Sequence, residues 1–257
     1  MQYNKISNLT GLPQSNKLSI LTLNNNHIFD ANHLSNVLRP FSDSLNSLSL
    51  SFNHLSAIPD LSFLSQLNAY DFSNNQISDP NSGAGSEIVS SADFSYNLLQ
   101  SVPVIYRSLK SVTIMLLPHN LIHRLQDTDI PYWVVNLDLE YNLITELTDT
   151  SFPANSSLLF LTLDNNPIKS ISSLAFKNLH SLESLTMQDT KLTRLPLTLA
   201  HLTSISYISL SYNPELVCTC LEKGVGKIAP YVDMSGMCGI VSIYNFLVEL
   251  SPGCPQM

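Results

Sequence analysis

The sequence is poor in charged residues, which make up 12% of its 257 positions against about 25% in an average soluble domain. Lys and Arg number 12 and Asp and Glu number 20, so the net charge of −8 has the wrong sign for neutralising nucleic-acid phosphates. The hydrophobic content of 44% is normal, which separates the chain from charged disordered proteins. The composition therefore excludes a nucleic-acid binder and a charged disordered segment, and it does not suggest an enzyme with a charged active site.

Long apolar runs are also missing. The opening residues MQYNKISNLTGLP contain no run of about 7–15 apolar residues, so we predict no signal peptide in this chain. No uncharged apolar stretch reaches about 18 residues, so we predict no membrane insertion. The most apolar window, residues 239–250, predicts a short amphipathic helix whose apolar side is formed by Ile240, Ile243, Phe246, Leu247 and Leu250.

An asparagine recurs in a fixed apolar frame along most of the chain. The frame reads L-x-x-L-x-L-x-x-N-x-L, as in LSILTLNNNHI (18–28) and LLFLTLDNNPI (158–168). Nine complete frames contain 36 apolar slots, of which 35 hold apolar residues, against about 16 expected by chance at this composition. The frame asparagines, with Thr190 in one gap, lie 22 to 27 residues apart at Asn4, Asn26, Asn53, Asn75, Asn97, Asn120, Asn142, Asn166 and Asn213.

This pattern resembles the leucine-rich repeat family over residues 1 to about 216. The resemblance implies an α/β solenoid, or horseshoe, with a parallel sheet on its concave face and an irregular, partly helical convex face. Each asparagine amide can bond its own turn and the neighbouring one, whereas Thr190 has only a hydroxyl, so we expect a looser turn there. We assign residues 1–216 to the repeat array, a partial first repeat plus nine complete ones, and residues 217–257 to a C-terminal cap.

The segments between the frames predict the opposite side of each repeat. Phe152 and Phe176 hold corresponding positions in two of these segments, similar to the buried spine of extracellular repeats. The longest repeat, residues 27–53, carries an insertion that predicts one or two helical turns.

All four cysteines lie in the last 40 residues, at Cys218, Cys220, Cys238 and Cys254. Four cysteines allow three disulfide connectivities, and a zinc site or free cytosolic thiols are alternatives. The Cys-x-Cys after the last Asn-Pro is similar to the cysteine-rich C-terminal flank of extracellular leucine-rich repeats. That resemblance implies the pairs Cys218–Cys238 and Cys220–Cys254, although the segment after Cys220 lacks the tryptophan customary in this flank, so its detailed fold is not predicted.

The N-terminus begins inside a repeat, because Asn4 and Ile6 fill the asparagine slot and the following leucine slot. We therefore expect a fragment of a longer secreted or membrane-anchored protein that lacks its N-terminal cap. The N-x-S/T sequons at Asn8 and Asn155 permit glycosylation, although two sequons are no more than chance in a chain so rich in Asn, Ser and Thr.

The outward positions of the predicted strands lie one, two, four and six residues before each frame asparagine. These 36 positions hold six acidic residues and no Lys or Arg. Aromatic residues surround an apolar island formed by Ile114, Leu116 and Pro118. Aromatic anchors among polar groups are typical of protein interfaces, and the charge favours a basic or neutral partner. A merely solvated face, or a site elsewhere, is the alternative. The candidate ligand-binding residues are Asp71, Asp93, Tyr96, Leu116, Asp138, Glu140, Tyr141, Phe160 and Asp164.

No group of residues predicts catalysis, a cofactor or a metal site. An open sheet offers the carboxylates no desolvated pocket that would shift their pKa. His27 and His54 fall on adjacent repeats about 5 Å apart, but Gln76 occupies the next one and no third ligand is evident. The one glycine cluster, SGAGS (82–86), lacks the lysine of a phosphate-binding loop.

We therefore predict a non-catalytic recognition module that binds a protein or peptide through the concave strand face. The resemblance places it outside the cell, as a secreted glycoprotein or a receptor ectodomain. Two alternatives belong to other classes: a structural, matrix-type protein that self-associates, and an intracellular scaffold with reduced cysteines. The family does not determine the partner, because specificity lies in the exposed positions and not in the scaffold.

Overall fold

The computed structural model describes residues 1–10, 12 and 17–254. The chain forms two compact units, residues 1–122 and 123–257, and each is described by itself. The sequence-based boundary after residue 216, between repeats and cap, falls inside the second unit and stays a prediction. Within the described residues no helix is long and apolar enough to cross a bilayer.

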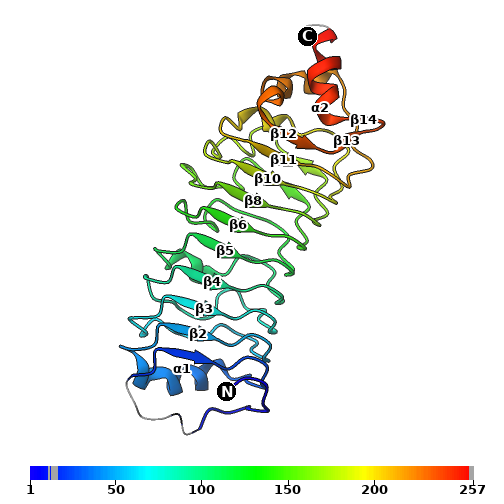
Figure 1. Cartoon of the computed structure of the whole chain (residues 1–257). Helices are drawn as coiled ribbons and strands as arrows, with labels where there is room; N and C mark the ends of the chain where they lie inside the picture. The colour runs from blue at the N-terminus through cyan, green and yellow to red at the C-terminus, as the bar shows by residue number, and fades with distance from the viewer. Residues whose placement is uncertain (11, 13–16, 255–257) are drawn as a thin grey trace. The chain divides into compact units, whose positions relative to one another are not determined.

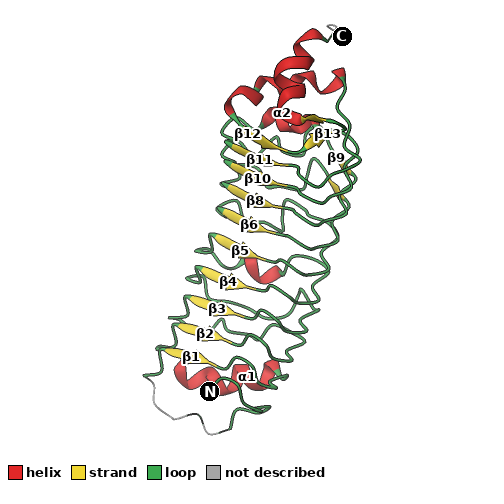
Figure 2. Ribbon diagram, turned by 45° about the vertical axis from the view of Figure 1, so that its right-hand side comes forward, coloured by secondary structure: helices red, strands yellow, loops and turns green. Residues whose placement is uncertain are grey.

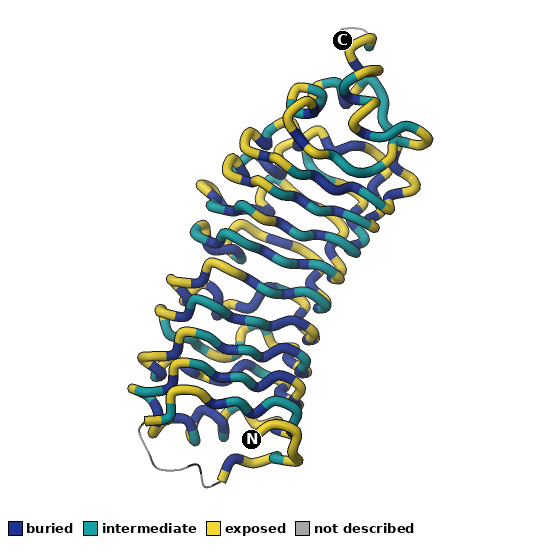
Figure 3. The backbone as a smooth tube through the Cα atoms, in the orientation of Figure 1, coloured by how far each residue is buried: buried dark blue, intermediate teal, exposed yellow. Residues whose placement is uncertain are grey.

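The first unit contains five short parallel strands that follow one another in chain order (Figure 1). The register places equivalent frame positions side by side, as in Ser49↔Asp71 and Asp71↔Asp93. The middle residue of each strand is buried and its two neighbours are more exposed, which confirms the predicted period of two (Figure 3). The elements are β1 (Ile20–Thr22), α1 (Ala31–Leu38), η1 (Arg39–Phe41), β2 (Ser47–Ser49), β3 (Ala69–Asp71), β4 (Ser91–Asp93), η2 (Val104–Arg107) and β5 (Ile114–Leu116).

The predicted helical insertion is confirmed as α1. The helix begins after Asp30, whose carboxylate accepts a hydrogen bond from the backbone N–H of His33 at 2.9 Å and so caps the first turn. Leu34 and Leu38, one turn apart, are fully buried. Figure 2 shows β1 to β5 along one side of this unit and loops along the other.

An aromatic cluster fills the core of the first unit between β3 and β5. The rings of Tyr70, Phe72, Phe94 and Tyr106 contact one another with centroids 5.1 to 5.8 Å apart. Tyr106 comes from η2 and donates its hydroxyl to the backbone carbonyl of Ala92 at 3.0 Å. An alanine stands at this inward strand position, and its small side chain leaves room for the tyrosine ring. Burial raises the pKa of both tyrosines well above its usual value.

The second unit repeats the arrangement with five parallel strands, β6, β8, β10, β11 and β12. Phe152 and Phe176 are buried with ring centroids 6.0 Å apart, so the predicted spine is confirmed. The elements are β6 (Asn136–Asp138), β7 (Glu146–Leu147), β8 (Phe160–Thr162), β9 (Ser170–Ile171), β10 (Ser184–Thr186), η3 (Leu197–His201), β11 (Tyr207–Ser209), η4 (Cys220–Lys227), η5 (Ala229–Tyr231), β12 (Asp233–Ser235), β13 (Met237–Cys238), β14 (Val241–Ser242), α2 (Ile243–Asn245), η6 (Phe246–Leu250) and η7 (Ser251–Gly253).

The frame asparagines hold neighbouring repeats together. The Asn97 amide donates to the carbonyls of Phe72, Phe94 and Ser95 at 3.0 to 3.2 Å, and its oxygen accepts the N–H of Ile77 at 2.9 Å. One buried side chain therefore satisfies four backbone groups in two repeats. The other frame asparagines from Asn26 onward make equivalent bonds within their own turns.

The Thr190 turn departs from this scheme. Its hydroxyl donates to the side-chain oxygen of Asn213 at 2.6 Å, and its backbone N–H donates to the same oxygen at 3.0 Å. With no amide oxygen at position 190, the N–H of Ile168 bonds instead to the carbonyl of Asn166, two residues before it, at 2.8 Å. The threonine therefore changes the bonding of three successive repeats, while the predicted looseness of the turn stays a prediction.

The C-terminal flank contains a strand and a hairpin that the sequence did not predict. β12 pairs with β11 in the register Tyr207↔Asp233, and β13 and β14 form an antiparallel hairpin. The predicted helix over residues 239–250 is wrong at its start, because the helical segment begins only at Ile243. Gly239 adopts φ +62 in the hairpin loop, a turn conformation that interrupts the helix and leaves Ile240 exposed.

Candidate functional site

The strand face comprises the outward residues of the parallel strands and of the turns that follow them. None of the nine candidate residues on it is buried. The first unit carries Asp71, Asp93, Tyr96 and Leu116, and the second carries Asp138, Glu140, Tyr141, Phe160 and Asp164.

Three candidates of the first unit form one row across neighbouring strands. Asp71 pairs with Asp93, and Asp93 pairs with Leu116. Adjacent strands are about 4.8 Å apart, so the two carboxylates lie close together on the same face. The row therefore places two carboxylates beside the apolar side chain of Leu116.

Tyr96 stands beside this row in the turn after β4. Its ring stacks on that of His119 in the next repeat, with centroids 4.0 Å apart and planes within 11°. Tyr96 is 50% exposed, so the pair presents an aromatic surface to solvent. His119 occupies one of the outward positions predicted from the sequence, but nothing in the repeat pattern distinguishes it as a site residue.

The second unit carries its acidic residues on two neighbouring repeats. Asp138 pairs in register with Thr162, and the amide of Asn165 donates to the Glu140 carboxylate at 3.3 Å. Tyr141 and Phe160 are 46% and 44% exposed. These five candidates therefore provide three carboxylates and two exposed rings on adjacent repeats.

Asp164 is the candidate whose ionisation is most perturbed. Partial burial raises its pKa, and the nearby Asp138 charge raises it further, although a bond from the backbone N–H of Gln188 at 2.7 Å opposes the shift. Because the folded-state pKa is raised, the ionised carboxylate costs stability at neutral pH. That cost falls as the pH drops through the raised value.

The strand-face carboxylates also have a structural role that the sequence did not reveal. Asp71, Asp93 and Asp138 each accept the N–H of the residue two positions later, at 2.9, 2.8 and 3.0 Å. In the β5 repeat the corresponding pair is Leu116 and Pro118, and a proline has no N–H to satisfy. The apolar island therefore occurs where the backbone needs no acceptor.

A second unpredicted feature is the conformation of the residue before each frame position. These residues all have φ between +47 and +60, the left-handed region. Asparagine tolerates this region, whereas aromatic residues adopt it at a cost. The column comprises Tyr3, Asn25, Phe52, Asn74, Tyr96, His119, Tyr141, Asn165, Asp189 and Tyr212.

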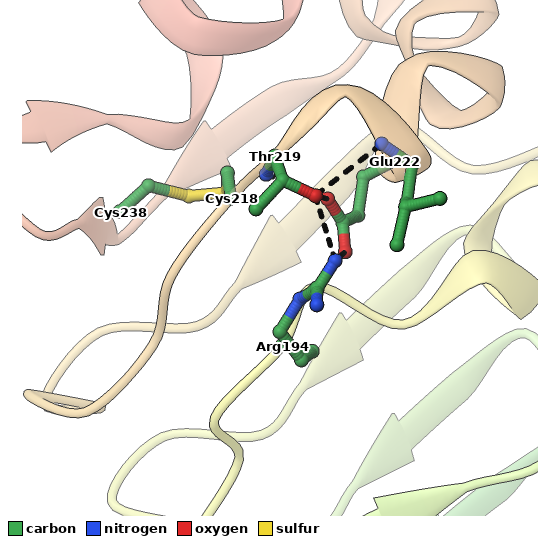
Figure 4. Close-up of polar contacts among 6 residues, drawn as sticks. Arg194, Cys218, Thr219, Glu222 and Cys238 are labelled. Carbon is green, nitrogen blue, oxygen red and sulfur yellow. Dashed lines mark hydrogen bonds and ion pairs between the residues drawn. A yellow bond between two sulfur atoms is a disulfide. The ribbon is translucent and has the colours of Figure 1, made fainter.

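Disulfides link segments within the flank, and an ion pair ties the flank to the last repeats (Figure 4). Cys218 pairs with Cys238 and Cys220 with Cys254, the same pairs that the resemblance implies. Arg194 bonds the Glu222 carboxylate through Nε at 2.9 Å, and it also donates to the Thr219 hydroxyl at 2.7 Å. Glu222 is only 2% exposed, and its other oxygen accepts the N–H of Thr219 at 2.6 Å. This ion pair, in which Glu222 is buried and Arg194 is 45% exposed, joins the segment before η3 to the start of η4.

The remaining candidates lie apart from the strand row. Both sequon residues, Asn8 and Asn155, are exposed. His27 and His54 stack with ring centroids 5.3 Å apart, and Gln76 bonds the second ring at 3.2 Å. Within the described ranges no three His, Cys, Asp or Glu residues are grouped to hold a metal ion.

Comparison with known proteins identifies the repeats. The family model "Leucine rich repeat" matches residues 134–192 and 156–214. Residues 134–214 match the leucine-rich repeat family, and the chain has the leucine-rich repeat fold. "Leucine-rich repeats and immunoglobulin-like domains protein 2" is 31% identical over 113 residues in Homo sapiens, covering 43% of this chain and 10% of the relative. The Mus musculus protein is 31% identical over 117 residues, covering 45% and 11%. The match thus spans about a tenth of these curated relatives.

Solved structures share the leucine-rich repeat fold at lower identity. A chain of the LRIM1/APL1C complex is 22% identical with a TM-score of 0.62, covering 80% of this chain and 37% of that one. The leucine-rich effector YopM from Yersinia pestis is 23% identical with a TM-score of 0.59, covering 84% and 57%. A chain in the octameric complex of Latrophilin 3, Unc5D and FLRT2 is 19% identical with a TM-score of 0.52, covering 92% and 88%. These likenesses confirm the α/β leucine-rich repeat fold.

Proposed function

We propose that this leucine-rich repeat protein is a non-catalytic recognition module that binds a basic or neutral protein or peptide through its strand face. The observation that carries the proposal is the pairing of exposed aromatic rings with carboxylates on each unit. Tyr96 and His119 lie beside the Asp71–Asp93 row, and Tyr141 lies beside Asp138. Exposed aromatic anchors beside acidic groups suit a partner with apolar and cationic side chains.

The bonding of the carboxylates supports binding over catalysis. Asp71, Asp93 and Asp138 each use one oxygen to accept a backbone N–H, which holds the side chain in place. Carboxylates held in place on an open face can attract a cationic partner without reorganising. An acid–base catalyst would instead need an enclosed pocket around its carboxylates.

Protein binding outside the cell is further supported by the comparisons and by the flank. Two of the similar solved structures are protein complexes, and the curated relatives are named for immunoglobulin-like domains. Disulfides persist in oxidising compartments, which favours a secreted protein or a receptor ectodomain over an intracellular scaffold. The exposed sequon at Asn155 is sterically open to glycosylation, as expected of a secreted glycoprotein.

The proposal is tested with the double variant Tyr141→Ala with Asp138→Asn. Asparagine keeps an oxygen that can accept the Glu140 N–H, so the variant removes charge and ring without removing the backbone bond. We expect any partner found on an array of cell-surface and secreted proteins to bind this variant at least about tenfold more weakly.

Tyr231→Ala is the matched control, because Tyr231 is 83% exposed in the flank. Its affinity for the same partner should be unchanged, and all variants should unfold at the same temperature as the parent. If the double variant and the parent bind the partner with equal affinity, the binding site does not lie on the strand face.

A further inference from the structure

A hollow lies in the second unit beside the hairpin formed by β13 and β14. Its volume is about 680 Å³, and its walls include Tyr212, Pro214 and Met237. Tyr212 is 77% exposed and Met237 is 49% exposed, so the apolar walls are open to solvent. The hollow adjoins the last two repeats and is separate from the candidate strand-face residues.

The hairpin whose Met237 lines this hollow also exposes an isoleucine in its loop. Gly239 and Ile240 form its two-residue loop, and Ile240 is 96% exposed. Ile240 is three residues from Met237, so their Cα atoms lie within about 10 Å of each other. The hairpin therefore carries a fully exposed apolar side chain, the Ile240 knob, in its loop and one wall of the hollow, Met237, in its first strand.

The structure holds this hairpin firmly in place. Cys238 is bonded to Cys218 (Figure 4), and the N–H of Gly239 donates to the carbonyl of Leu216 at 3.0 Å. Gly236 has φ +128, and a Cβ there would lie 2.9 Å from the carbonyl oxygen of Leu210. The glycine therefore permits a close approach to the last repeat that a larger residue would prevent.

Two charges of opposite sign border the hollow. Asp189 and Lys191 both line it, and both are exposed. Within the described chain neither side chain forms a hydrogen bond or an ion pair. The patch therefore combines a knob with a hollow and an unpaired acid with an unpaired base.

We propose that two copies of this chain dock through the patch about a twofold axis. A twofold interface uses the same surface on both subunits, so that surface must complement itself. Ile240 of each copy enters the hollow of the other, and Asp189 of each copy pairs with Lys191 of the other. This contact uses none of the nine candidate ligand-binding residues.

Sedimentation velocity of the disulfide-intact full chain tests the proposal. The patch is formed by few residues, so the interface between the two copies is small. We expect a monomer–dimer equilibrium with a dissociation constant between about 1 µM and 1 mM. Ile240→Ser removes both knobs of each dimer and should weaken it about 100-fold or more. Leu174→Ser, at a residue 42% exposed outside the patch, is the control and should dimerise like the parent.

Charge reversal supplies a test that misfolding cannot mimic. Asp189→Lys and Lys191→Asp should each abolish dimerisation, because like charges then face each other. An equimolar mixture of the two variants should restore a dimer containing one copy of each, because both contacts again join opposite charges. Glu183→Lys, an exposed acid elsewhere on the unit, should leave the dimer unchanged. A parent that stays monomeric up to about 1 mM, or a mixture that stays monomeric, would overturn the proposal.

Discussion

The repeat array and the C-terminal flank are held together by different kinds of contact. In the array, one asparagine per repeat makes the same set of backbone bonds again and again, as Asn53, Asn75 and Asn97 show. In the flank, each connection occurs once: two disulfides and the ion pair of Arg194 with Glu222. Repetition makes the array visible in the sequence, whereas the single contacts of the flank leave no periodic trace.

The largest effect is expected from removing one asparagine of the array. Asn97→Ala leaves the buried N–H of Ile77 without its partner and removes one of the two donors from the carbonyls of Phe72, Phe94 and Ser95. It should lower the free energy of unfolding by about 4 kcal/mol. Chemical denaturation measures the change. Asn136→Ala, at an outward strand position, is the control, and its effect should stay within about 0.5 kcal/mol. Equal effects of the two variants would remove the distinction between frame and face asparagines.

A smaller but still substantial effect is expected in the flank. Arg194→Met keeps most of the apolar stem but leaves the buried Glu222 carboxylate without its cation, so it should cost about 3 kcal/mol. Lys110→Met breaks an ion pair with Glu87 whose side chains are 63% and 64% exposed, and it should cost less than about 0.5 kcal/mol. If both variants unfold at the same denaturant concentration, the flank contact contributes no more than a surface pair.

The same contrast explains how much of the molecule could be predicted. The leucine slots specify strands and register, because a shift by one residue would expose every inward side chain. β12 escaped notice because Asp233–Ser235 is not followed by a frame asparagine. Ile240 matched a helical apolar pattern, but the Gly239 turn and the Cys238 bond place it in a hairpin. Periodicity cannot report such local exceptions.

For the candidate residues, the sequence predicted the outward position along the strands but not the hydrogen bonds. The alternation shows that Asp93 points outward, yet nothing in it shows that this carboxylate accepts the N–H of Ser95. Likewise, Asn25 is a residue type that suits a positive φ, whereas Tyr96 adopts the same conformation with no chemical sign of it. The burial pattern predicts which face of the sheet a side chain occupies. Its orientation and its hydrogen bonds depend on details of the backbone that differ between repeats.

The smallest effect is expected at Thr190, in the repeat that lacks its asparagine, one repeat before the end of the array. Thr190→Asn supplies an amide oxygen for the N–H of Ile168 and an amide donor for the carbonyls of its own turn. It also gives up the hydroxyl bond to Asn213, so the net gain in unfolding free energy should be about 1 kcal/mol. Thr190→Val, which loses that bond and gains none, should be destabilised by a similar amount. If Thr190→Asn is instead destabilised, the hydroxyl bond of Thr190 to Asn213 contributes more than the asparagine bonds that replace it. The last repeat would then resemble the flank, and not the array, in how it is bonded.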